Sequence, residues 1–129
     1  MTTRKEIALP GSAPVSHYTD AVRFGNLLFI SGMVAIDENQ NVMHEGDVVG
    51  QARHIFESIK KVLEGEGAGF KDVLKVTVYM QHIEDRTKIT PVREEYFGET
   101  RPASALVEVA NLVIPGLLVE VEAVAGIPD

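Results

Sequence analysis

The spacing of apolar residues between positions 48 and 80 constrains the fold of this chain most strongly. From Val48 to Leu63 these residues recur at steps of three and four, which predicts one buried stripe along a helix. Asp47 is expected to cap the start of this helix, and Gly65 and Gly67 are expected to end it. From Val73 to Met80 the pattern alternates and is rich in β-branched residues, so this segment is predicted to be a strand.

Further elements flank this helix and strand. The Gly25-Asn26 pair precedes an apolar run and indicates a hairpin turn. A second helix is expected to begin at Asp85 or Thr87 and to run through Phe97, with Pro91 tolerated only near its first turn. Two final strands are expected near residues 105–109 and 117–125. This order of elements predicts an α+β sandwich in which the helices cover one face of a mixed sheet.

Length, composition and charge exclude several classes of protein. With 129 residues, of which 45% are hydrophobic, the chain is expected to form one domain over residues 1–129. A net charge of −7, with 12 Lys and Arg scattered among 19 acidic residues, argues against nucleic acid as a partner. No apolar run is long enough to span a membrane, and Glu6 and Pro10 stand where a signal peptide needs an apolar core. A cytoplasmic protein without membrane partners is therefore expected.

Residues that commonly bind metals or cofactors do not form a recognisable motif here. The sequence has no cysteine, which excludes disulfides and thiolate zinc sites. His17, His44, His54 and His82 lack the spacing that metal ligands show on a helix, and no glycine-rich phosphate loop is present. Neither a metal nor another cofactor is expected. His17 lies beside Tyr18 and is the one histidine expected near a ligand cleft, whereas His54 is interpreted as a residue at the boundary of the helix stripe.

Two carboxylates interrupt the apolar pattern of the last strand. Leu118, Glu120, Glu122 and Val124 share one face of this strand, and the residues between them form a wholly apolar second face that should meet the helices. Like charges two residues apart raise the pKa of at least one of them when they are partly buried, which makes that residue a candidate acid or base. The alternative is a wet outer sheet face on which both carboxylates point into solvent.

Five segments in order resemble the RidA (YjgF) family through nearly the whole chain. They are Ala13-Pro14 with Tyr18-Thr-Asp-Ala-Val22, Gly25-Asn-Leu-Leu-Phe-Ile-Ser-Gly32, Gln51-Ala52, Leu74-Lys-Val-Thr-Val-Tyr79, and Pro102-Ala103 with Val119–Ala125. The resemblance implies a chorismate-mutase-like fold, with a mixed sheet of about six strands and two helices packed on one face. It also implies a homotrimer with clefts between subunits, where the helix-free sheet faces meet.

The resemblance further implies hydrolysis of a small reactive enamine or imine, such as 2-iminobutyrate, to a keto acid and ammonia. Carried over by position, Glu120 becomes the carboxylate that orients water, and Tyr18 lines the cleft. Gly32 brings backbone close to the ligand with no side chain in the way, and Ser31 either hydrogen-bonds the ligand or ends the strand.

The sequence departs from the family pattern at two substrate-binding positions. Ser104 stands where the family has an arginine that grips the substrate carboxylate, and Thr90 stands in place of an asparagine. Losing a guanidinium fork at a desolvated site costs about 2–5 kcal/mol of binding. Arg101 lies three residues earlier, and an odd spacing on a strand places it on the opposite face, so it is no simple substitute. Arg93 on the second helix, or an arginine of a neighbouring subunit, is left open as a replacement.

Two classes of function follow from this pattern. The first is a RidA-like hydrolase or deaminase of a small enamine, imine or related unsaturated metabolite, acting at inter-subunit clefts on a substrate other than 2-iminobutyrate. The second is a non-catalytic trimer that binds a small metabolite or regulates a partner. Glu120 and Tyr18 favour a working cleft, whereas Ser104 argues against 2-iminobutyrate as the substrate.

Overall fold

The structure of the chain is a computed structural model that describes residues 3–12 and 14–128. Ala13 of the Ala-Pro pair, and the first two residues of the stretch considered as a signal peptide, lie outside the described residues. Within the described ranges, no helix has both the length and the apolar character needed to cross a bilayer.

The described residues form six strands, two α-helices and two short 3₁₀ helices. In chain order these are β1 (Arg4–Ile7), β2 (Ala21–Phe24), β3 (Leu27–Met33), α1 (Val48–Gly65), η1 (Phe70–Asp72), β4 (Val73–Met80), η2 (Ile83–Asp85), α2 (Arg86–Phe97), β5 (Ala103–Glu108) and β6 (Val119–Gly126).

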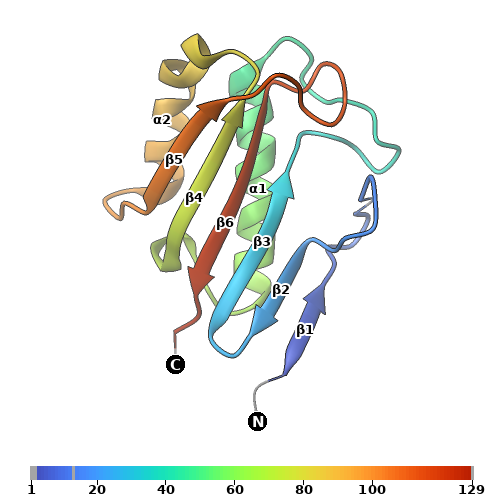
Figure 1. Cartoon of the computed structure of the whole chain (residues 1–129). Helices are drawn as coiled ribbons and strands as arrows, with labels where there is room; N and C mark the ends of the chain where they lie inside the picture. The colour runs from blue at the N-terminus through green and yellow to red at the C-terminus, as the bar shows by residue number, and fades with distance from the viewer. Residues whose placement is uncertain (1–2, 13, 129) are drawn as a thin grey trace.

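The strands make one mixed sheet in the order β1-β2-β3-β6-β4-β5. β4 and β5 pair in parallel, with α2 in the connection between them, and the other neighbouring strands pair antiparallel. Both helices lie behind the sheet in Figure 1, so its other face carries no helix. The predicted α+β sandwich with helices on one face is therefore confirmed, and the last strand lies near the middle of the sheet.

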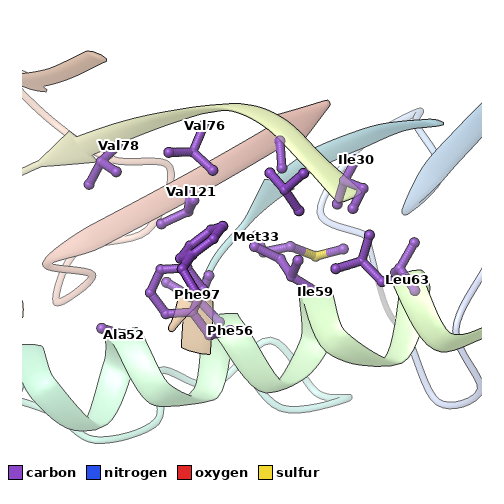
Figure 2. Packing of buried hydrophobic residues seen from close by; sticks show 14 of the residues in the cluster. Ile30, Met33, Ala52, Phe56, Ile59, Leu63, Val76, Val78, Phe97 and Val121 are labelled. Atoms are coloured by element: carbon purple, nitrogen blue, oxygen red, sulfur yellow. The ribbon is translucent and has the colours of Figure 1, made fainter. Parts of the chain in front are cut away.

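The hydrophobic core fills the space between α1 and the sheet. Asp47 caps the helix as expected, because its carboxylate accepts a hydrogen bond from the Gly50 backbone N–H at 2.9 Å. Figure 2 shows Ile30, Val76, Val78 and Val121 of the sheet facing side chains of α1. The buried residues of α1 follow the predicted stripe, with one polar addition: they are Val48, Gln51, Ala52, Ile55, Phe56, Ile59, Val62 and Leu63.

Several element boundaries differ from the sequence predictions. β5 starts at Ala103, two residues earlier than expected, and β6 starts at Val119 rather than at residue 117. Pro91 lies in the second turn of α2, beyond the position where proline was expected to be tolerated. Ile89 and Val92 on either side of Pro91 are buried, and this packing outweighs the lost hydrogen bond. The strand β1 was not indicated by any residue pattern.

Candidate functional site

β6 carries the two carboxylates on the helix-free face of the sheet. Glu120 pairs with Tyr79 and Glu122 with Thr77 across the β4–β6 ladder. The alternate residues of the segment face the helices and are buried, as predicted: Leu117, Val119, Val121, Ala123 and Ala125. Glu120 and Glu122 are both partly buried, so neither is a fully solvated side chain.

Gly32 on β3 gives the Glu120 carboxyl the room that it occupies. The β3–β6 register shifts between Ile30 and Met33, and Gly32 lies within this irregularity. A Cβ atom placed on Gly32 would lie 2.5 Å from Oε2 of Glu120 and 2.9 Å from its Cδ. Because non-bonded carbon and oxygen atoms do not approach each other so closely in proteins, any side chain at position 32 must displace this carboxyl.

The surroundings of Glu120 make its carboxyl hold a proton more tightly than an ordinary glutamate. Burial raises the pKa of Glu120 first, and the nearby charge of Glu122 raises it further. Among the described residues no side chain or backbone N–H donates a hydrogen bond to the Glu120 carboxyl, whereas the Tyr79 hydroxyl donates to Oε1 of Glu122 at 2.6 Å. That bond also raises the pKa of Tyr79. Glu120 is therefore the carboxyl that is available to exchange protons with a ligand or a water molecule.

Tyr18 and Gly32 line a common cavity of about 600 Å³. The cavity lies between the N-terminal loop, the segment after β3 and one side of α1, and the Tyr18 side chain is 44% exposed. Ser31 does not contribute its hydroxyl proton, because its Oγ donates to the Thr19 carbonyl oxygen at 2.6 Å. Ser31 thus links β3 to the segment that carries Tyr18.

Asp20 was not predicted as a site residue, yet it shapes the wall of this cavity. Its side chain is buried and accepts hydrogen bonds from the Leu9 backbone N–H at 2.8 Å and from the Ser12 hydroxyl at 2.9 Å. These bonds hold the N-terminal loop over the cavity. A sequence signal for this role was absent, since the partners are backbone and a serine in an irregular segment.

Thr90 on α2 and Ser104 on the edge strand β5 do not line this cavity. The Thr90 hydroxyl donates to the Arg86 carbonyl oxygen at 3.2 Å, and its side chain is exposed. Nη2 of Arg93 donates to Oγ of Ser104 at 2.8 Å. Arg93, one of the replacements left open by the sequence, therefore reaches Ser104 with its guanidinium.

Two of the predicted site residues, Ser104 and Glu120, lie on opposite faces of the sheet. Ser104 is in register with Val76, which is buried against the helices, whereas Glu120 is in register with Tyr79 on the helix-free face. One chain therefore places Glu120 against Gly32, and Gly32 shares a cavity with Tyr18 that Glu120 itself does not line. Ser104 instead contacts Arg93 of α2.

The histidines form one pair that the sequence spacing did not indicate. The rings of His44 and His54 have centroids 6.4 Å apart, and both burial and the neighbouring His44 lower the pKa of His54. His54 is partly buried at the edge of the helix stripe and lines the cavity, but His17 is exposed and does not line it. In the part of the chain that the structure describes, no three His, Asp or Glu side chains form a group that could hold a metal ion.

Comparison with known proteins finds a family match and similar sequences over nearly the whole chain. Residues 10–127 match the family model described as Endoribonuclease L-PSP. The chain is 41% identical over 123 residues to a RutC family protein of Pyrococcus horikoshii, covering 94% of this chain and 97% of that one. It is 38% identical to the 3-aminoacrylate deaminase RutC of Acinetobacter baylyi, covering 95% and 98% of the two chains.

A solved structure agrees with the sequence matches. YyfA of Yersinia pestis, a member of the conserved Rid protein family, superimposes with a TM-score of 0.87 at 29% identity, covering 97% of this chain and 100% of that one. The chain belongs to the RidA/YjgF family, whose members include enamine and imine deaminases.

Proposed function

We propose that this protein is a hydrolase of the deaminase type that acts on a small enamine or imine in clefts between the subunits of a homotrimer. The observation that carries the proposal is the Glu120 carboxyl, partly buried over Gly32, with a raised pKa and no donor among the described residues. A carboxyl in this condition can take a proton from a water molecule and return it to a leaving group. The 3-aminoacrylate deaminase among the relatives supports this class of reaction.

In the proposed reaction Glu120 moves protons while water adds to the carbon of a C=N bond. An enamine gains a proton on carbon and loses one from nitrogen to become an imine. The Glu120 carboxylate accepts a proton from water as the water oxygen bonds to the imine carbon, and it passes this proton to the nitrogen to give an amino alcohol. The proton of the new hydroxyl then moves through the carboxyl to the nitrogen as the C–N bond breaks, so that ammonia leaves and a carbonyl group remains. The water oxygen ends in that carbonyl, so no redox partner or cofactor enters the balance.

The assembly into trimers is part of the proposal and is supported by the exposed apolar surface. Phe24, Leu27, Phe29 and Val107 lie on the helix-free face, because they share register with other residues of that face, and each is more than one third exposed. An apolar sheet face of this kind is typical of an interface between copies. A cleft between two copies also allows Glu120 of one chain and Ser104 of another to contact the same substrate.

The first test compares Glu120→Gln with Glu122→Gln on freshly generated 2-iminobutyrate and 3-aminoacrylate, with ammonia release measured against the uncatalysed rate. Glu120→Gln should lower kcat by at least about 10²-fold, since a proton-transfer group contributes about 10²–10⁴-fold. Glu122→Gln is the matched control from the same face and should keep most of the activity. Full activity in Glu120→Gln would overturn the role of this residue.

The pH profile gives a second readout of the same pair. The carboxylate form of Glu120 is required, so activity falls as pH drops through its pKa, which lies above that of an ordinary glutamate. Removing the Glu122 charge lowers the Glu120 pKa, so Glu122→Gln should move this fall to lower pH. If the wild type binds ligands but releases no ammonia from either substrate, the non-catalytic metabolite-binding alternative replaces the enzyme.

A further inference from the structure

Arg93 brings a guanidinium to the corner between α2 and the edge strand β5. It lies on α2, and its guanidinium reaches across to Ser104 on β5 with the 2.8 Å hydrogen bond described above. Thr90 lies three residues earlier on the same helix, a spacing that places the two side chains on one face. Arg93 and Ser104 therefore meet at one corner between α2 and the edge of the sheet, with Thr90 on the same helix face as Arg93.

The Arg93 guanidinium is partly buried and has no counter-charge among the described residues. Within residues 3–12 and 14–128, the ion pairs of the structure involve Arg4, Arg23 and Arg53 but not Arg93. Burial lowers the pKa of Arg93, yet a guanidinium stays protonated at neutral pH. A partly desolvated cation without an anion beside it favours binding one.

The hydrogen bond to Ser104 leaves most of the guanidinium available. Arginine has five N–H donors in a planar fork, and among the described residues one of them is engaged, by the Ser104 hydroxyl oxygen. Ser104 is exposed, and its hydroxyl donates no hydrogen bond to another described residue. A planar fork with an adjacent hydroxyl donor matches the two oxygens of a carboxylate.

We propose that Arg93 is the carboxylate anchor of this protein, supplied from α2 instead of β5, and that Ser104 is the positioning residue that fixes its guanidinium. The substrate is accordingly a small enamine or imine that carries a carboxylate. This inference rests on the proposed function for the reaction, but the anchor itself is tested by binding alone.

The test measures the affinity of the purified assembled protein for 2-oxobutyrate, an unreactive keto acid, by calorimetric titration. Methyl 2-oxobutyrate, which lacks the charge, is the matched ligand. Arg93→Met should weaken 2-oxobutyrate binding by at least about thirtyfold and leave the ester unaffected, because removing one partner of a charged pair at a desolvated site costs this much or more. Arg93→Lys should fall between the two, since it keeps the charge and loses the fork.

Two further variants test whether the anchor is Arg93 or a different arginine. Arg101→Met removes the other arginine near Ser104 in sequence and should leave the Kd for 2-oxobutyrate unchanged. If Arg101→Met weakens this binding and Arg93→Met does not, the proposal is overturned. Arg93→Met combined with Ser104→Arg returns a guanidinium to the strand and should restore binding. The melting temperature and the assembly mass of each variant show that the protein is folded.

The outcomes distinguish this inference from the proposed function. Loss of 2-oxobutyrate binding in Arg93→Met supports the anchor even if the wild type hydrolyses no enamine. An unchanged Kd in Arg93→Met overturns the anchor even if the wild type is an active deaminase. A wild type that binds the ester but not 2-oxobutyrate also overturns it.

Discussion

At the scale of single residues, the candidate site depends on the contact between Glu120 and Gly32, which leaves room for the carboxyl because glycine has no side chain. The Glu120 carboxyl lies over Gly32, and a methyl group at position 32 would come within 2.5 Å of Oε2. The Gly32 backbone does not have a positive φ angle, so alanine brings no backbone strain. The contact involves the far end of a flexible side chain, which can move away. A substitution here therefore moves the Glu120 carboxyl without disturbing the fold.

Gly32→Ala is expected to lower kcat for enamine hydrolysis at least about tenfold while the melting temperature stays close to that of the wild type. A displacement of about 1 Å at a reacting group is enough for a loss of this size. Gly65→Ala is the matched control, because a Cβ at the end of α1 meets no atom within 4 Å. Steady-state kinetics and thermal melts of both variants are the measurements. An active Gly32→Ala protein would contradict the placement of Glu120.

Sequence alone could locate Glu120 but not the contact of Arg93 with Ser104. Strand parity places Glu120 beside Glu122, and the pKa of Glu120 is raised as this spacing predicts. The contact between Arg93 and Ser104 depends on how α2 packs against β5, which no local periodicity determines. The hydrogen bond from Ser31 to the Thr19 carbonyl was equally invisible, since it joins a strand to an irregular segment. Local sequence patterns predict which residues share one face of a helix or strand. Which side chains of different elements come into contact depends on tertiary packing.

At the scale of elements, α1 is joined to the start of β6 by one buried glutamine. The Gln51 side chain donates to the Gly116 carbonyl oxygen at 3.0 Å and accepts from the Leu118 backbone N–H at 2.8 Å. Gln51 is completely buried, so its amide relies on these protein partners. The glutamine therefore holds the 112–116 loop and sets the point at which the strand carrying Glu120 begins.

Gln51→Leu is expected to destabilise the protein by roughly 1–3 kcal/mol, because it removes the hydrogen bonds of a completely buried side chain and leaves the N–H of the partly buried Leu118 without its partner. Gln81→Leu is the control, since the Gln81 side chain makes one bond to the Ala110 carbonyl oxygen at a solvent-accessible position, where water takes its place. Urea denaturation of both variants gives the free energies of unfolding. Equal losses in the two variants would mean that Gln51 has no special role in this connection.

Element boundaries were predictable where periodicity was strong. The predicted strand Val73–Met80 has the observed bounds of β4, and α1 begins at its predicted cap. The N-terminal strand β1 has mostly exposed residues and pairs at the sheet edge, so its sequence carries little alternation to detect. α2 keeps Pro91 in its second turn because of tertiary contacts. Propensity alone cannot anticipate such contacts.

At the scale of the whole molecule, the sheet has one face that the helices cover and one that they leave open (Figure 1). The open face presents Phe29, which is 47% exposed, together with Phe24 on β2 and, further across the sheet, Val107 on β5. Aromatic and aliphatic side chains gathered in this way are stabilised when they are removed from water. This surface is where we expect copies of the chain to associate.

Light scattering during size-exclusion chromatography should give a wild-type mass about three times the 14.1 kDa of the chain. Phe29→Lys places a charge in the expected interface and should shift the protein to lower mass. Val113→Lys is the matched control, because Val113 is 57% exposed but lies in a loop outside the sheet. A monomeric wild type, or a Phe29→Lys protein with unchanged mass, would contradict association through this face.

The placement of Glu120 and Ser104 on opposite faces of the sheet has a genetic consequence. Suppose that each cleft takes its proton-transfer group from one copy and its anchor from another. A working cleft then requires two intact contributions, which different copies of the chain can supply. An allele that lacks the proton-transfer group and an allele that lacks the anchor would then complement each other, because some mixed assemblies contain an intact cleft. Two alleles that lack the same group would not.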